Sequence, residues 1–142
     1  MGDGGIMKMR ILTSGKGKIS KLGQMLADKH NCNIDVIPPA FNCEKERLVL
    51  IGASLSDELD NALVLFAKGM SKQRAQNVGL FLTGSQKGGD KLVALLKEAG
   101  TNVIEDIYWV NSGSLLSIFK GISAEEKDAI NAWSDKVIES LA

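Results

Sequence analysis

The stretch that decides the fold is Arg47–Ser54 (RLVLIGAS), an almost unbroken run of apolar residues. A strand that is apolar at nearly every position is typical of a strand buried on both faces of its sheet. Directly after it, Ser56-Asp57-Glu58 forms a polar helix start, and apolar residues at helical spacing continue to about Met70. A doubly buried strand that leads into a helix indicates an α/β protein with a parallel sheet.

The alternation of strand and helix extends in both directions from this stretch. Apolar runs predict further strands at Met9–Ser14, Ile34–Ile37, Asn77–Thr83 and Asn102–Val110, the last interrupted by Glu105-Asp106. Amphipathic spacing predicts further helices at Ser20–His30, at Asp90–Ala99 and from Ser123 to about Leu141. We therefore expect a three-layer α/β sandwich, in which a five-stranded parallel sheet is covered by helices on both faces.

The connection Pro38–Glu46 indicates the order of the strands. It has nine residues, which is too few for a crossover helix but enough for an extended chain to pass one intervening strand. This favours the order 2-1-3-4-5, with the first strand between the second and the third. We expect one domain over residues 9–142, preceded by a flexible, glycine-rich N-terminus at residues 1–8.

The composition excludes several classes of function. The chain has 142 residues, 17 basic and 17 acidic, so it lacks the basic excess of most nucleic-acid-binding proteins. It has no apolar run near the roughly 20 residues that cross a bilayer. Two cysteines and one histidine are too few for the common zinc sites. We expect a reduced, cytoplasmic protein with no membrane segment and no nucleic-acid partner.

Ligands of open parallel sheets bind at the carboxyl ends of the strands, where the strand order reverses. In the predicted order this point lies between the first and third strands. The connections to inspect are therefore Ser14–Ser20 and Ala53–Asp57, with Gly84–Gly89 as their neighbour.

The first of these connections, Thr13–Ser20 (TSGKGKIS), has the features of an anion site. Gly15 and Gly17 allow the backbone to approach a ligand, and the helix that follows presents its positive N-terminus. The surrounding sequence is basic and contains no acid, with Lys8, Arg10, Lys16, Lys18 and Lys21. The alternative interpretation is a plain strand-to-helix turn with solvated lysines. Neither a Walker A loop nor a GxGxxG fingerprint is present.

These motifs resemble those of the flavodoxin-like family, in its short-chain form. Ser14–Ile19 (SGKGKI) falls where flavodoxins carry a (Thr/Ser)-x-Thr-Gly-x-Thr phosphate loop. Ser14 and Gly17 match this pattern, whereas Lys16 and Ile19 replace hydroxyl residues. Leu50–Ser54 is similar to the family segment that flanks the flavin ring, and Phe81–Ser85 is similar to the third flavin-contacting loop.

The resemblance implies FMN binding and electron transfer with a redox partner protein, and a carrier rather than a catalyst with its own substrate. In the first connection the implied phosphate-binding residues are Ser14, Gly15, Lys16, Gly17, Lys18 and Ile19. In the other two the implied ring-binding residues are Ala53, Ser54, Leu55, Ser56, Thr83, Gly84 and Ser85, with Leu55 covering one ring face. The positive charge of Lys16 or Lys18 would replace the hydroxyl groups with which the family binds the phosphate.

Two other functions remain open on the sequence. One is a flavodoxin-like interaction or regulatory module that has lost flavin. The other is an enzyme that binds a different phosphorylated ligand in the same crevice. Outside the three connections, we expect Tyr108 and Trp109 in the sheet, with a flavin or partner contact as the alternative. Trp133 is expected in the core, and Glu126 is interpreted as completing a capping box with Ser123.

Overall fold

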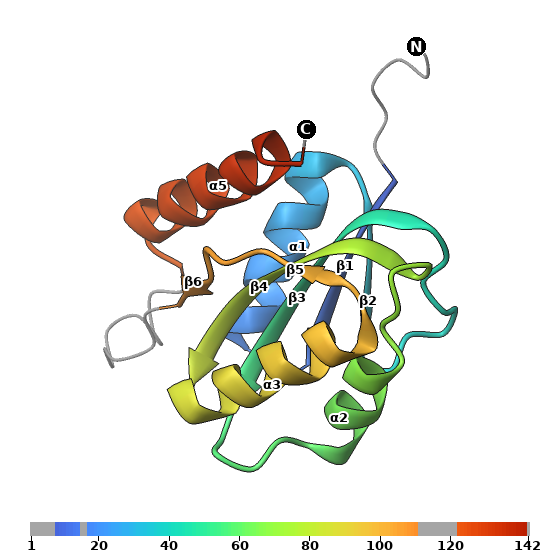
Figure 1. Cartoon of the computed structure of the whole chain (residues 1–142). Coiled ribbons are helices and arrows are strands. Elements are labelled where there is room, and N and C mark those ends of the chain that lie inside the picture. The colour runs from blue at the N-terminus through green and yellow to red at the C-terminus, as the bar shows by residue number, and fades with distance from the viewer. Residues whose placement is uncertain (1–7, 15–16, 111–121, 142) are drawn as a thin grey trace.

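The computed structural model describes residues 8–14, 17–110 and 122–141, which form a sheet between two layers of helices (Figure 1). The strands are β1 (Met9–Ser14), β2 (Asn33–Val36), β3 (Glu46–Leu55), β4 (Ala75–Gly84), β5 (Asn102–Val103) and β6 (Tyr108–Trp109). The helices are α1 (Lys18–His30), α2 (Asn61–Lys68), α3 (Gln86–Ala99) and α5 (Ala124–Glu139). The expected flexible N-terminus lies outside the described residues except for Lys8, whose carbonyl accepts from the Arg47 amide.

The strand pairs of the described sheet are parallel and follow the order β2-β1-β3-β4-β5, with β6 also paired to β4. The predicted α/β sandwich and the order 2-1-3-4-5 are therefore confirmed. The fifth position is shared by two short strands because the edge chain bulges between them. From Val78 to Phe81 β4 advances three residues, while the edge chain advances five, from Val103 to Tyr108. The two extra residues fall in the region where Glu105-Asp106 interrupts the apolar pattern.

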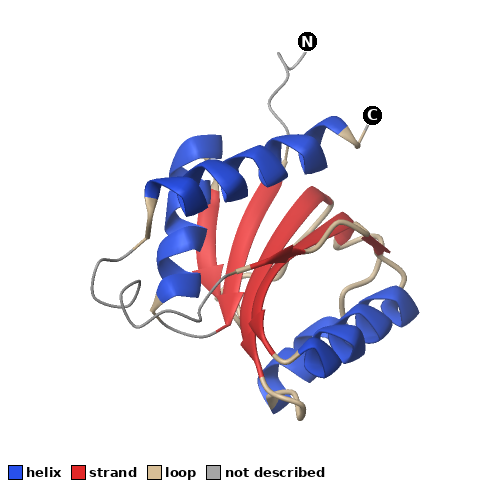
Figure 2. Cartoon of the chain, turned by 90° about the vertical axis from the view of Figure 1, so that its left-hand side faces the viewer, coloured by secondary structure: helices blue, strands red, loops and turns tan. Residues whose placement is uncertain are grey.

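Helices lie on both faces of the sheet (Figure 2), and each face has a separate buried core. Helices α2 and α3 cover one face, where Ile51, Leu63 and Leu92 belong to the same buried cluster. Helices α1 and α5 cover the other face, where Leu22, Leu50 and Trp133 pack together. This burial of alternate residues of β3 on opposite faces explains why its sequence is apolar throughout.

Three helices begin at other residues than the sequence indicates, and the smallest difference is in α1, which begins at Lys18 rather than at Ser20. Helix α3 begins at Gln86 rather than at Asp90, because the Ser85 hydroxyl accepts from the Gly88 amide and caps the helix. Gly88 and Gly89, expected in a loop, lie in its first turn. Helix α2 begins at Asn61, later than the polar start at Ser56–Glu58.

Gly52 on β3 allows the Phe81 ring of β4 to lie directly against the backbone. A Cβ at Gly52 would lie 2.2 Å from Phe81 Cε2, and Phe81 is fully buried. Gly52→Ala should therefore lower the free energy of unfolding by about 1–3 kcal/mol, as measured in urea. The matched control is Gly69→Ala, because a Cβ at Gly69 meets nothing closer than 3.7 Å. Equal loss of stability in the two variants would contradict this packing.

Candidate functional site

The carboxyl ends of β1, β3 and β4 form one continuous edge. Ser14 at the end of β1 pairs in register with Ala53, Ser54 pairs with Thr83, and Leu55 pairs with Gly84. The structure thus brings the strand-end residues predicted for the site, among those it describes, together at the point where the strand order reverses. Ser54 and Gly84 are exposed there, Ser14 and Thr83 are half-buried, and Ala53 is buried.

At the first connection the chain enters α1 through Gly17. This residue has φ 71°, a left-handed value that glycine adopts without strain, and a Cβ there would meet no atom within 4 Å. The first turn of α1 contains no acidic residue. Ile19 is only 1% exposed and belongs to the core between the sheet and helices α1 and α5, so its side chain is not available to a ligand. Gly15 and Lys16 lie outside the described residues.

Lys18, the first residue of α1, has its ammonium directed at a buried carboxylate. Lys18 Nζ lies 2.5 Å from Glu126 Oε1, and the Glu126 side chain is 8% exposed. The Tyr108 hydroxyl donates to Glu126 Oε2 at 2.6 Å. Glu126 therefore joins the N-terminus of α5 to that of α1 and to β6, and the charge of Lys18 is already opposed by a carboxylate before any anion binds.

Glu126 consequently has a larger role than the capping residue that the sequence indicates. Ser123 does cap α5, because its hydroxyl accepts from the Glu126 amide at 3.1 Å. The Glu126 carboxylate, however, binds Lys18 and Tyr108. No local pattern in the sequence could reveal this, because the three residues lie on three separate elements.

The second and third connections are bound to each other. The Ser85 amide donates to the Leu55 carbonyl at 2.9 Å, and the Ser85 hydroxyl lies 2.5 Å from Asp57 Oδ1. Lys91 Nζ donates to the Asp57 carbonyl at 2.8 Å. Ser56 is exposed, and its hydroxyl donates to the Glu58 carbonyl at 2.7 Å. Asp57 and Lys91 were not among the residues predicted for the site.

The Leu55 side chain is not placed to cover a flavin ring. Its side chain is 8% exposed and belongs to the core between the sheet and helices α2 and α3. Leu55 can therefore offer a ligand its backbone, while its side chain stabilises the end of β3.

The two adjacent aromatic residues point to opposite faces of the sheet. Tyr108 packs against Trp133, with ring centroids 6.0 Å apart, and Trp133 is buried as expected. Trp109 lies over the first turn of α3, where a Cβ at Gly89 would be 2.9 Å from its ring. Both aromatics therefore have structural contacts in the sheet, and Trp109 remains 37% exposed.

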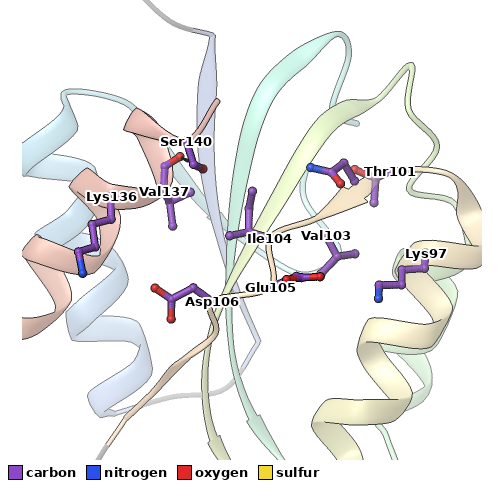
Figure 3. Close-up of a pocket in the computed structure, with 10 residues that line it drawn as sticks. Lys97, Thr101, Val103, Ile104, Glu105, Asp106, Lys136, Val137 and Ser140 are labelled. Atoms are coloured by element: carbon purple, nitrogen blue, oxygen red, sulfur yellow. Dashed lines mark hydrogen bonds between the residues drawn. The ribbon is translucent and has the colours of Figure 1, made fainter. Parts of the chain in front are cut away.

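A groove of about 750 Å³ lies at the other end of the outer edge (Figure 3). Val103 and Ile104 of the edge chain line it, between Lys97 of α3 and Lys136 of α5. None of the residues predicted for the site lines this groove.

The described residues also contain no cluster of His, Cys, Asp or Glu that could hold a metal ion. Within the same residues, no helix has the length and apolar character that crossing a membrane requires.

Comparison with solved structures identifies the fold. A short-chain flavodoxin associated with a PDU bacterial microcompartment matches with a TM-score of 0.64 and 11% identity, over 96% of this chain and 99% of its own. A flavodoxin from the domain Archaea matches with a TM-score of 0.50 and 12% identity, over 80% of this chain and 90% of its own. The chain therefore has the flavodoxin-like fold. Neither a protein-family model nor a curated protein sequence matches it.

The buried contact between Tyr108 and Glu126 has a measurable consequence. The pKa of Tyr108 is raised well above its ordinary value of 10.0. The largest cause is burial, followed by the hydrogen bond to Glu126 and the negative charge of Glu126. Below about pH 9 the phenol is neutral in the folded and unfolded states, so it adds no pH dependence. At higher pH only the unfolded state ionises, and the free energy of unfolding should fall.

Tyr108 is the only tyrosine in the chain, so tyrosinate absorbance reports on it alone. We expect the native protein to show no tyrosinate absorbance at pH values where the denatured protein is largely ionised. Glu126→Gln should lower the pKa of Tyr108, because the negative charge beside the phenol is removed. Glu125→Gln, on the exposed neighbouring residue, should leave it unchanged. A native pKa equal to that of the denatured chain would contradict the contact.

Proposed function

We propose that the protein binds FMN by its phosphate at the β1–α1 connection and takes part in electron transfer with a partner protein. Bound FMN supplies one- and two-electron chemistry of its own, and the chain supplies binding and orientation. The proposal rests on the flavodoxin-like fold of the chain. The observation that carries it is the open, left-handed Gly17 at the head of α1, beside the carboxyl ends of β1 and β3.

The phosphate end of FMN fits the described residues. The amides of Gly17, Lys18 and Ile19 lie at the head of α1, where a dianion is favoured by the helix dipole. Ser14 ends β1 and has a hydroxyl that can donate to a phosphate oxygen. Gly15 and Lys16 complete the proposed loop on the sequence. Lys18 acts in the proposal through its backbone, because its ammonium is paired with Glu126.

The ring end of FMN has fewer partners. Ala53, Ser54, Ser56, Thr83, Gly84 and Ser85 would contact the ring edges through backbone groups and small side chains. No aromatic residue lies in the described parts of the three connections, and Leu55 faces the core. We therefore propose that the phosphate supplies most of the affinity and that one ring face stays open to the partner. Free Cys32 and Cys43 agree with a reduced, cytoplasmic setting for this chemistry.

Titration with FMN tests the proposal directly. FMN fluorescence should be quenched on addition of the protein, with saturation at one FMN per chain. Lys16→Ala should weaken FMN by about 1 kcal/mol or more, because it removes a positive charge from the part of the sequence proposed to bind the phosphate. Lys21→Ala removes an equal charge from an exposed position on α1 and is the matched control, with an effect well below this.

The other outcomes separate the alternative functions. Unquenched FMN fluorescence at high protein concentration would contradict the proposal. Quenching that is unchanged in Lys16→Ala would show that backbone amides and Ser14 suffice for the phosphate. Binding of inorganic phosphate without binding of FMN would favour an enzyme or sensor for another phosphorylated ligand. Binding of neither would favour an interaction module.

A further inference from the structure

We propose that Asp57 is a latch that keeps planar rings out of the space between the second and third connections, so that it decides which phosphorylated ligands enter the site. This inference rests on the proposed function for the identity of the ligand. The latch consists of two contacts that hold the β3–α2 connection against the first turns of α3: the Asp57 carboxylate contacts the Ser85 hydroxyl, and the Asp57 main-chain carbonyl accepts from Lys91.

The two connections that the latch joins are packed directly against each other. A Cβ at Gly84 would lie 2.2 Å from the Leu55 carbonyl oxygen, and a Cβ at Gly88 would lie 2.3 Å from the Ser56 carbonyl oxygen. Both distances are shorter than any real contact of a Cβ atom with an oxygen. The backbone at Leu55 and Ser56 thus packs directly on Gly84 and on the first turn of α3 at Gly88, so a planar ring that lies between Ser56 and α3 has to displace residues 56–60.

The contacts of the latch are polar and lie at the surface, so they are releasable. Asp57 and Lys91 are exposed, and Ser85 is half-buried. Hydrogen bonds in such positions contribute little net stability, because water replaces them when they break. Leu55, by contrast, is anchored in the core. The part of the connection that can move away from α3 is therefore residues 56–60, beyond this anchor.

The latch distinguishes ligands by the shape of the group attached to the phosphate. The phosphate site proposed at Gly17 lies on β1 and α1 and makes no use of Asp57. A phosphate with a small substituent is therefore bound with the latch closed. A phosphate that carries a planar ring requires the open form, and its apparent affinity is reduced by the fraction of molecules in which the latch is closed.

The experiment compares the affinities for FMN and for inorganic phosphate in Asp57→Ala and Asp60→Ala. Asp60 is the matched control because it is exposed, belongs to the same connection and makes no side-chain capping contact at α2. Either substitution removes one negative charge and should favour both anions alike. The ratio of FMN affinity to phosphate affinity isolates the carboxylate contact of the latch, because the Asp57 carbonyl that accepts from Lys91 is kept in Asp57→Ala. We expect this ratio to rise about three- to tenfold in Asp57→Ala and to stay at the wild-type value in Asp60→Ala.

Amide hydrogen exchange provides a readout that needs no ligand. The amide of Gly88 is buried beneath the Ser56 carbonyl and donates to the Ser85 hydroxyl that contacts Asp57, so it should exchange faster in Asp57→Ala than in Asp60→Ala or wild type. Equal exchange, or an unchanged affinity ratio when the wild type does bind FMN, would overturn the latch and leave the proposed function standing. Failure of both wild type and Asp57→Ala to bind FMN would overturn the proposed function and the latch together.

Discussion

The parallel pairing of β1, β3 and β4 is the constraint on which the rest of the structure depends. Because the three strands run in one direction and in register, their last residues, Ser14, Leu55 and Gly84, come to one edge of the sheet. The chain then leaves β1 for α1 on one face, and leaves β3 and β4 for α2 and α3 on the other. This divergence around β1 and β3 creates the only reversal of strand order in the described sheet, and hence the candidate site.

Two sets of polar contacts fix the helices around this edge, and they differ in burial. Glu126 binds Lys18 and Tyr108 within the protein, so the N-termini of α1 and α5 are held together by charges that solvent screens little. Asp57 binds Ser85 and Lys91 at the surface, where water competes for each contact. One side of the site is therefore a rigid frame for an anion, while the other side can rearrange.

The fold could be predicted from the sequence because burial on both faces leaves a clear pattern, as in Arg47–Ser54. The strand order followed from the short connection Pro38–Glu46. The site could be predicted only as a set of loops. The sequence predicts a loop at Gly88 and Gly89, but both lie in helix α3. They are glycines because Ser56 and Trp109 pack too closely against the helix to leave room for a side chain. The contact of Lys18 with Glu126 joins residues far apart in the chain, and no periodicity or spacing reveals such a pair.

The most direct test of the account is the backbone amide spectrum of the protein with increasing FMN. If the head of α1 holds the phosphate, the largest shifts should come from Gly17, Lys18 and Ile19, with smaller shifts at Leu55 and Ser85. Inorganic phosphate should reproduce the first set without the second. An unchanged spectrum, or shifts confined to the groove beside Val103 and Ile104, would contradict the account.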